Sequence, residues 1–343
     1  MTRGVTVAVD ANGADLGPAE VAAGAATAAA QGVRVLLFGP ADQLGVPAPG
    51  VEIVDAPASV AKAADPARAV RASPDSSIVR AVRAVGEGRA DAFVSGGSTG
   101  AALAAGLFNV KRGRGVHRPA LAAAVPVPGH PVTLLDVGAN AEVRPEHLVQ
   151  FAFMGAALSS VVLGVASPRV GLLSNGEEAT KGTALVREVH AQLAAVRGLN
   201  WIGNVEGTDL TSGKADVIVA DGFTGNVALK ALEAASQATL GAVRAAATSG
   251  ARAKLGGLML KPALRSVRDE VDPENAGGAY LLGLRHLGVV PHGRFTRYGF
   301  SQAILLAARG VSGDVVGRTH AALEAAGALR PSTQASDASP SVA

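Results

Sequence analysis

Five segments of the chain repeat one pattern, in which an apolar run ends in a Gly-rich polar loop and a helix-forming segment usually follows. The segments are Val7–Asp15, Ala92–Ala101, Thr133–Asn140, Val170–Gly182 and Val217–Asn226. Loops that leave the strands of a parallel sheet collect at one edge, where ligands bind. Glycines let backbone N–H groups approach a ligand closely, and helix N-termini favour anions. The pattern therefore predicts one composite site for phosphate.

Several side chains in these loops are suited to contact an anion or a developing oxyanion. Lys181 is the one lysine among the five loops, although a solvated surface lysine beside two glutamates fits the same spacing. Ser98 and Thr99 offer hydroxyl groups. Asn140 and Asn226 end their loops, where an asparagine serves either as a helix cap or as an amide donor.

The segment Gly96–Gly100 fits the pattern G-x-S-x-G of a serine nucleophile, with Ser98 at its centre. Asp221 and His292 follow in the order of a serine hydrolase, and His292 is the one histidine that we take as a site candidate. The chain is rich in Gly and Ser, so a chance match is easy. The same loop, including the backbone at Gly100, suits a phosphate cradle or a tight turn without a ligand.

Four aspartates lie in three of the five loops, at Asp10, Asp15, Asp136 and Asp221. Clustered carboxylates without a nearby histidine more often orient loop backbone than bind a metal, so we assign these residues to loop orientation. No Gly-rich dinucleotide motif follows the first strand, and no P-loop motif occurs. We therefore expect no metal and no cofactor.

The composition of the 343 residues restricts the partners. The net charge is +3, aromatic residues make up 3%, and there are no cysteines. Base stacking needs aromatic side chains, so nucleic acid is not an expected partner. Disulfides and thiolate chemistry are excluded. Acidic residues come too early for a signal peptide, and no apolar run is long enough to span a bilayer, so we expect a soluble cytoplasmic protein.

Strand and helix patterns alternate along the chain, which predicts an α/β layered fold. We expect a single domain over residues 1–330 and a disordered tail over 331–343, while Asp65–Ser73 reads as a loop. Residues 227–272 have the pattern of an appended helical hairpin, with Pro262 in the first turn of a helix. Near that proline stand four apolar residues that favour contact with a membrane surface or a dimer partner: Leu255, Leu258, Met259 and Leu260.

Taken together, these segments resemble the acyl-ACP:phosphate acyltransferase (PlsX) family. The similarity runs from about Val7 to Ala308 and is strongest in LLDVGAN, RPEHLVQFAFMG, ADVIVADGFTGNVALK and GGAYLLG. The resemblance implies a three-layer α/β/α fold with a mostly parallel sheet, like the isopropylmalate dehydrogenase and phosphotransacetylase groups. It also implies a homodimer that transfers a fatty acyl group from acyl carrier protein to inorganic phosphate, giving acyl phosphate for phospholipid synthesis.

The chain departs from the family pattern in four loops, and in the loop after Val170 the departure is a shift of Asn175 and Gly176. Leu16 stands where the family usually has histidine, and Arg294–Thr296 replaces two small hydroxyl residues and an aspartate. Ser98 stands where the family has asparagine, which cannot act as a nucleophile, so the serine-hydrolase interpretation weakens. The departures leave open a module that binds acyl carrier protein or phosphate without catalysis, beside a serine esterase or thioesterase that uses Ser98.

The favoured mechanism is direct attack of a phosphate oxygen on the acyl thioester, because phosphate is itself a nucleophile and the protein has only to position it. We assign catalysis to Lys181, Asn226 and His292, and phosphate contact to Ser98, Thr99, Gly100 and Asn140. The hairpin adds reversible contact with the inner face of the membrane as an alternative to a pure dimer interface.

Overall fold

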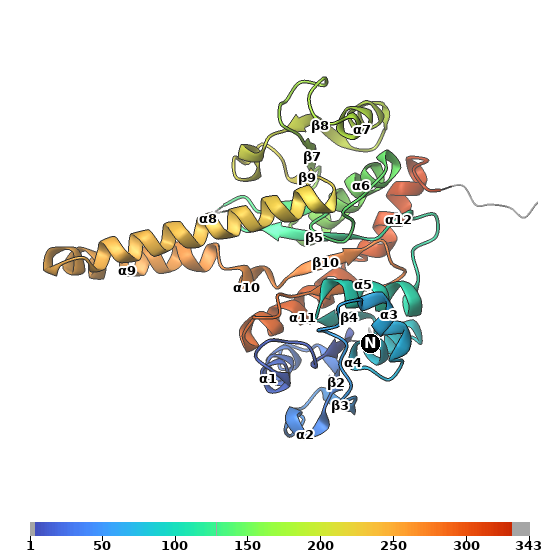
Figure 1. Ribbon diagram of the computed structural model, residues 1–343, viewed down its shortest axis with the longest axis vertical. Coiled ribbons are helices and arrows are strands. Elements are labelled where there is room, and N and C mark those ends of the chain that lie inside the picture. Colours follow the sequence, from blue (N-terminus) through green and yellow to red (C-terminus); the bar gives the residue numbers. More distant parts are fainter. Residues whose placement is uncertain (1–3, 128, 331–343) are drawn as a thin grey trace, which may run out of the picture.

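The computed structural model describes residues 4–127 and 129–330, and its centre is one 11-stranded sheet. The sheet order is β3-β2-β1-β4-β11-β10-β5-β6-β9-β7-β8 (Figure 1). The strands are β1 Thr6–Asp10, β2 Arg34–Gly39, β3 Val51–Asp55, β4 Ala92–Ser95, β5 Ala120–Val125, β6 Val132–Leu135, β7 Arg169–Leu173, β8 Asn200–Val205, β9 Val217–Val219, β10 Ala279–Leu282 and β11 Leu287–Val290. The predicted α/β fold with a mostly parallel sheet is confirmed. The single domain over 1–330 stays a prediction, and the expected tail at 331–343 lies outside the described residues.

The sheet reverses direction at its centre. Seven strand pairings are parallel, but β10 pairs antiparallel with both β5 and β11, and β5 pairs antiparallel with β6. As a result β1, β4 and β11 run one way, whereas β6, β9 and β7 run the other. The expectation that all five loops share one edge of the sheet is therefore wrong. The antiparallel pairs in the middle turn three of the five loops, those after β6, β7 and β9, to the opposite edge.

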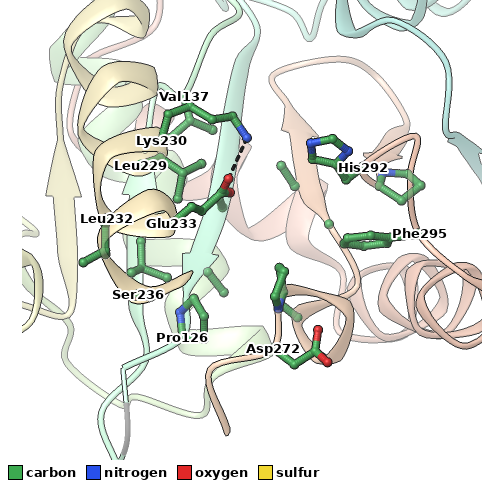
Figure 2. A pocket seen from close by; sticks show the side chains of 18 of the residues that line it. Pro126, Val137, Leu229, Lys230, Leu232, Glu233, Ser236, Asp272, His292 and Phe295 are labelled. Atoms are coloured by element: carbon green, nitrogen blue, oxygen red, sulfur yellow. Dashed lines mark hydrogen bonds and ion pairs between the residues drawn. The ribbon is translucent and has the colours of Figure 1, made fainter. Parts of the chain in front are cut away.

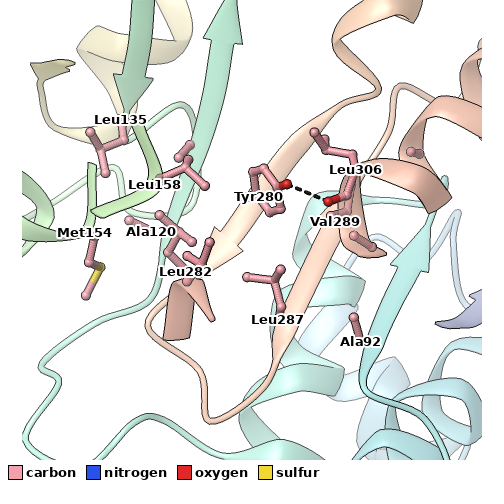
Figure 3. Packing of buried hydrophobic residues seen from close by; sticks show 14 of the residues in the cluster. Ala92, Ala120, Leu135, Met154, Leu158, Tyr280, Leu282, Leu287, Val289 and Leu306 are labelled. Atoms are coloured by element: carbon pink, nitrogen blue, oxygen red, sulfur yellow. Dashed lines mark hydrogen bonds between the residues drawn. The ribbon is translucent and has the colours of Figure 1, made fainter. Parts of the chain in front are cut away.

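Helices cover both faces of the sheet. They are α1 Pro18–Ala29, α2 Ala41–Leu44, α3 Pro66–Ala72, α4 Ser77–Gly86, α5 Thr99–Ala105, α6 Pro145–Val162, α7 Ala184–Ala195, α8 Gly222–Thr248, α9 Ala251–Glu270, α10 Pro273–Ala276, α11 Arg297–Ser312 and α12 Val315–Ala325. Strand residues alternate between two cores, as a strand buried on both faces requires: Val7 and Val9 join α1 and α11, whereas Ala8 joins α4. Figure 3 shows the first core, where the hydroxyl of Tyr280 donates to the carbonyl of Leu306 at 2.6 Å.

Two expectations about local structure are wrong. Residues Asp65–Ser73 do not form a loop, because Pro66–Ala72 is the helix α3. Asp65 caps this helix by accepting a hydrogen bond from the backbone N–H of Arg68 at 3.0 Å. Pro262 does not start a helix. It lies inside α9, an exposed helix that continues on both sides of the proline. The strands β3 and β10 were also not expected from the sequence pattern.

The helices α8 and α9 form an antiparallel hairpin that extends away from the sheet (Figure 1). Only the first turns of α8 pack on the body, where Gly222 and Gly225 are buried. The α9 helix has no buried residue. Among the described residues, none of the helices combines the length and apolar character that crossing a membrane requires.

Candidate functional site

A large cavity of about 820 Å³ lies between α8 and the centre of the sheet. Its floor is the face of β5 that carries Leu121, Ala123 and Val125, together with Ala279 of β10 and Val290 of β11. The volume is in the range of small-molecule sites, which are mostly apolar with a few placed polar groups. The three strands around the antiparallel β10 at the centre of the sheet thus form the base of this site.

Polar groups from distant segments meet at this cavity. Ser98 and Thr99 come from the loop after β4, Asn226 and Lys230 from the first turns of α8, and His292 from the loop after β11. Figure 2 shows Lys230 on the α8 wall and His292 on the wall across from it. These groups offer hydroxyl, amide, ammonium and imidazole donors, which suit an anion.

The remainder of the cavity follows α8 and is mostly apolar, although Ser236, Gln237, Arg268 and Asp272 also line it. Leu229, Leu232 and Leu240 line it at helical spacing, and Val271 and Phe295 contribute from the other segments. An α-helix rises 1.5 Å per residue, so the wall from Asn226 to Leu240 is about 21 Å long. One cavity therefore joins an anion-suited region to a long apolar channel.

The loop after β4 has ordinary backbone geometry. Ser98 has φ −70° and ψ 137°, and its hydroxyl accepts a hydrogen bond from the N–H of Ala101 at 3.1 Å as the cap of α5. Within the described part of the chain, Ser98 and His292 share no hydrogen bond. Gly100 packs against α3, because a Cβ atom there would lie 3.0 Å from Pro66. The strained turn that exposes a nucleophilic serine is not formed.

The start of α8 is pressed against the loop after β6. A Cβ atom at Gly225 would lie 2.0 Å from the carbonyl oxygen of Asp136, and one at Gly222 would lie 2.5 Å from that of Asn140. Asp221 caps the helix by accepting from the N–H of Thr224 at 2.8 Å. This close approach, which glycine permits, fixes the position of Asn226 one turn into the helix.

Asp136 and Asn140 hold the loop after β6 together. Asp136 accepts hydrogen bonds from the backbone of Leu121, Ala139 and Asn140, and burial raises the pKa of this carboxyl. The amide of Asn140 donates to Asp136 at 2.8 Å and to the carbonyl of Pro119 at 2.7 Å. Asn140 is buried and does not line the cavity, so its amide nitrogen is occupied by the loop.

Asp10 and Asp15 lie beside the cavity without lining it. Asp10 accepts from the hydroxyl of Ser95 at 2.7 Å, and burial raises the pKa of its carboxyl. The N–H of Asp15 donates to the carbonyl of Gly293 at 2.8 Å. This contact ties the loop after β1 to the loop that carries His292, and the loop-orienting role of Asp10 and Asp15 stays a prediction.

Lys181 lies apart from the large cavity. Its loop follows β7, and its neighbours Asn175 and Gly182 line a separate cavity of about 490 Å³ that also contains Asp221 and Thr224. The first turn of α8 therefore contributes to both cavities. Lys181 is exposed, and within the described residues its ammonium makes no ion pair.

Lys230 and Glu233 line the cavity but were not singled out from the sequence. Lys230 is one helical turn after Asn226, so the i, i+4 spacing places both on one face of α8. That spacing was the available signal. The walls of the cavity desolvate the ring of His292, and the positive charges of Arg294 and Lys230 add to this effect, so the pKa of His292 is lowered.

One group of possible metal ligands lies outside the cavity within the described residues. It consists of His117, Glu146 and His147, whose ligand atoms lie within 4.8 Å of one another. Burial lowers the pKa of both histidines, and the positive charges of Arg112 and Arg144 act on His117 in the same direction. These charges oppose a divalent cation, so we assign no metal site.

The chain was compared with known proteins by sequence. Residues 5–318 match the family model described as fatty acid synthesis protein. The chain is 43% identical over 319 residues to a phosphate acyltransferase of Streptococcus equi subsp. zooepidemicus, covering 91% of this chain and 95% of that protein. It is 42% identical over 326 residues to a phosphate acyltransferase of Geobacillus thermodenitrificans, covering 93% and 99%.

The fold was compared with solved structures. A phosphotransacetylase from Streptococcus pyogenes superimposes with a TM-score of 0.60 at 16% identity, covering 91% of this chain and 95% of that chain. The EutD phosphotransacetylase from Staphylococcus aureus gives a TM-score of 0.58, also at 16% identity, covering 90% and 94%. At this identity the likeness shows a shared fold.

Proposed function

The chain belongs to the fatty acid synthesis protein family of phosphate acyltransferases, and we propose that it moves a fatty acyl group from acyl carrier protein to inorganic phosphate. Acyl transfer to phosphate follows from the family. The acyl-carrier donor and a role in phospholipid synthesis are our proposal. The observation that carries it is the single cavity in which Ser98, Asn226 and Lys230 adjoin an apolar channel along α8.

The apolar channel supports a fatty acyl substrate. Each methylene group that moves from water into such a channel contributes about 0.8 kcal/mol, so a long chain gains substantial binding energy there. Leu229, Leu232 and Leu240 face that chain from one helix. The reacting carbonyl then lies at the polar end, because the carboxyl end of the chain is its one polar group.

Phosphate is the attacking group in this proposal. An oxygen of phosphate forms a bond with the thioester carbonyl carbon, and the carbon–sulfur bond then breaks to release the thiolate of the carrier. Ser98 and Thr99 hold phosphate through hydroxyl donors, and the ammonium of Lys230 compensates its charge. The neutral ring of His292 accepts the proton of the attacking phosphate and returns it to the leaving thiolate.

The amide of Asn226 is the oxyanion donor in this proposal. Within the described residues its side chain makes no hydrogen bond, so its N–H groups are free to meet the negative charge that develops on the carbonyl oxygen. Lys181 belongs to the loop that lines the neighbouring cavity, which also contains Asp221 and Thr224 at the start of α8. We assign Lys181 to charge stabilisation on the thioester, and the phosphate role of Asn140 becomes indirect, through Asp136.

The hairpin supports contact with a second surface. Leu255, Leu258, Met259 and Leu260 are 58–78% exposed on α9. We propose that they contact either an anionic membrane surface or a second copy of the chain, which would place the enzyme at the inner face of the membrane as a homodimer.

The test is incubation of the purified protein with long-chain acyl carrier protein and phosphate, with acyl phosphate trapped by hydroxylamine. The proposal expects a hydroxamate that forms only when phosphate is present, with release of one carrier thiol for each hydroxamate. Thiol release without phosphate would instead indicate a thioesterase, and binding without thiol release would indicate a non-catalytic module. A fluorophosphonate probe should leave Ser98 unlabelled, because its hydroxyl has no histidine partner.

A further inference from the structure

A second concave site lies where β5 begins, away from the large cavity. It has a volume of about 620 Å³ and is formed by residues 111–116, the turn between β10 and β11, and the C-terminal end of α12. None of its lining residues lines the large cavity. Five of them are cationic, and Glu324 is the one carboxylate. We call this site the basic cleft; its cations are Lys111, Arg112, Arg114, Arg285 and Arg330.

The positive charges of the basic cleft are not neutralised by the fold. Among residues 4–127 and 129–330, none of the five cations lies within 4.0 Å of a carboxylate oxygen. Like charges that converge in a cleft raise the local potential and concentrate anions there. With Glu324 as the one carboxylate of its lining, the cleft keeps an excess of positive charge that an anionic ligand can neutralise.

The backbone of the basic cleft is held from inside the protein. Gln150 of α6 is 1% exposed, and its Oε1 accepts from the N–H of His117 at 2.8 Å. Its Nε2 donates to the carbonyl of Gly115 at 3.0 Å and to that of Ala328 at 2.7 Å. One buried amide thus fixes the loop to the end of α12. The N–H of Arg330 adds a bond to the same carbonyl of Gly115 at 2.8 Å.

Lys111 has an unusual backbone conformation in this cleft. Its φ is 72° and its ψ 165°, a region that is occupied almost exclusively by glycine. The N–H of Lys111 donates to the carbonyl of Gly106 at 2.9 Å, and its own carbonyl accepts from Arg285 at 3.1 Å. Such conformations persist where the surrounding structure imposes them, and they gather at functional sites.

We propose that the basic cleft binds a small anion that carries two or more phosphate groups. Five cations exceed what one phosphate can contact at once, and the cleft has the volume of a small-molecule site. The lining contains no Phe, Tyr or Trp, so recognition falls on the phosphates and requires no stacked base. A concave site with a fixed backbone favours a compact ligand over an acidic protein surface.

Calorimetric titration with inorganic pyrophosphate, at two salt concentrations, tests the proposal on the full-length protein. Arg114 and Arg330 make no side-chain hydrogen bond within the described residues, so Arg114→Gln with Arg330→Gln should leave the fold intact. We expect each lost contact to weaken pyrophosphate binding about tenfold, and monophosphate to bind far more weakly than pyrophosphate. Arg285→Gln alone is a second variant with a single contact removed.

The matched control removes two exposed arginines elsewhere, by Arg34→Gln with Arg197→Gln, and should bind pyrophosphate like the unchanged protein. Failure of the unchanged protein to bind pyrophosphate would overturn the proposal, as would equal losses in the control. Binding of acyl carrier protein that depends on Arg114 and Arg330, without pyrophosphate binding, would assign the cleft to a protein partner. Acyl phosphate formation by the same variants, measured in the hydroxamate assay, should be unchanged. A loss of pyrophosphate binding at the basic cleft can therefore be distinguished from a failure of the proposed function.

Discussion

The Nζ atom of Lys230 lies 2.8 Å from Oε2 of Glu233, and both residues line the large cavity on the same face of α8 (Figure 2). Both side chains retain solvent exposure, so the ion pair contributes less than about 1 kcal/mol to stability. The carboxylate of Glu233 thus pairs with the ammonium that we propose as a phosphate contact.

Lys230→Met should therefore impair catalysis far more than folding. Loss of a charged hydrogen bond to phosphate corresponds to a decrease in kcat/KM for phosphate of about 10- to 100-fold. The hydroxamate assay at varied phosphate measures this decrease, and thermal unfolding checks that stability is retained. Glu233→Gln is the matched change, which should lower the KM for phosphate because the competing carboxylate is gone. An unchanged phosphate dependence in both variants would remove Lys230 from the site.

Asn226→Ala should reduce kcat by about 10²- to 10³-fold, the range for loss of one oxyanion donor. The side chain makes no hydrogen bond in the described structure, so its removal should not change the unfolding temperature appreciably. Lys181→Ala provides the comparison, because its loop lines the neighbouring cavity and its ammonium is exposed. We expect a severe loss of turnover there as well. Near-normal acyl phosphate formation by Lys181→Ala would instead leave charge stabilisation to Lys230.

The rate should fall on acidification as His292 becomes protonated. Desolvation, with the charges of Arg294 and Lys230, lowers the pKa of His292 below its ordinary value of 6.5, so the ring is neutral at pH 7. Phosphate itself titrates in the same range, so the informative quantity is the ratio of rates between the unchanged protein and His292→Gln. This ratio should decrease below the lowered pKa of His292. A ratio that is independent of pH would show that His292 does not transfer the proton.

Stability gives an independent check on the same residue. Because the pKa of His292 is lowered in the folded state, the unfolded chain binds more protons below about pH 6.5. Titration of His292 therefore leaves the free energy of unfolding unchanged above that pH and lowers it as the pH falls further. Urea unfolding at neutral and mildly acidic pH should show a smaller acid destabilisation in His292→Gln than in the unchanged protein.

Leu258→Glu together with Met259→Glu should abolish binding to anionic vesicles if the hairpin contacts a membrane. The two side chains are 64% and 78% exposed, and charge at these positions opposes burial among lipid chains. Val46→Glu is the control, since Val46 is 94% exposed far from the hairpin. Sedimentation with vesicles measures binding, and analytical ultracentrifugation measures the mass. A double variant that becomes monomeric while vesicle binding is unchanged would assign the hairpin to the dimer alone.

The sequence predicted the fold class, because alternating apolar runs and capped helices are local signals. It predicted the five strands β1, β4, β6, β7 and β9 for the same reason. The prediction that all five loops share one edge of the sheet was wrong because the antiparallel pairings of β5 and β10 reverse the direction of the strands beyond them. These pairings join segments that are distant in the sequence, and the local sequence of β5 or β10 does not indicate them. Helix α3 was overlooked although Asp65 and Pro66 form a normal helix start.

The candidate site was predicted in part. Ser98, Thr99, Asn226 and His292 were singled out from their loops and line one cavity. Lys230 was not predicted because it lies within a helix, one turn beyond the Gly-rich loop. Asn140 was assigned to phosphate, but its amide serves Asp136 and Pro119, a use that depends on tertiary contacts.

The length of α8 has a mechanical consequence. The helix is clamped at Gly222 and Gly225, carries Asn226 beside the clamp, and continues without interruption to Thr248 at the far end. With 1.5 Å of rise per residue, that far end lies about 33 Å from Asn226, so a tilt of about 5° at the clamp moves it by about 3 Å. Helix α8 therefore acts as a lever: a force at its free end near Thr248 tilts the helix about Gly222 and Gly225 and acts on the adjacent amide of Asn226.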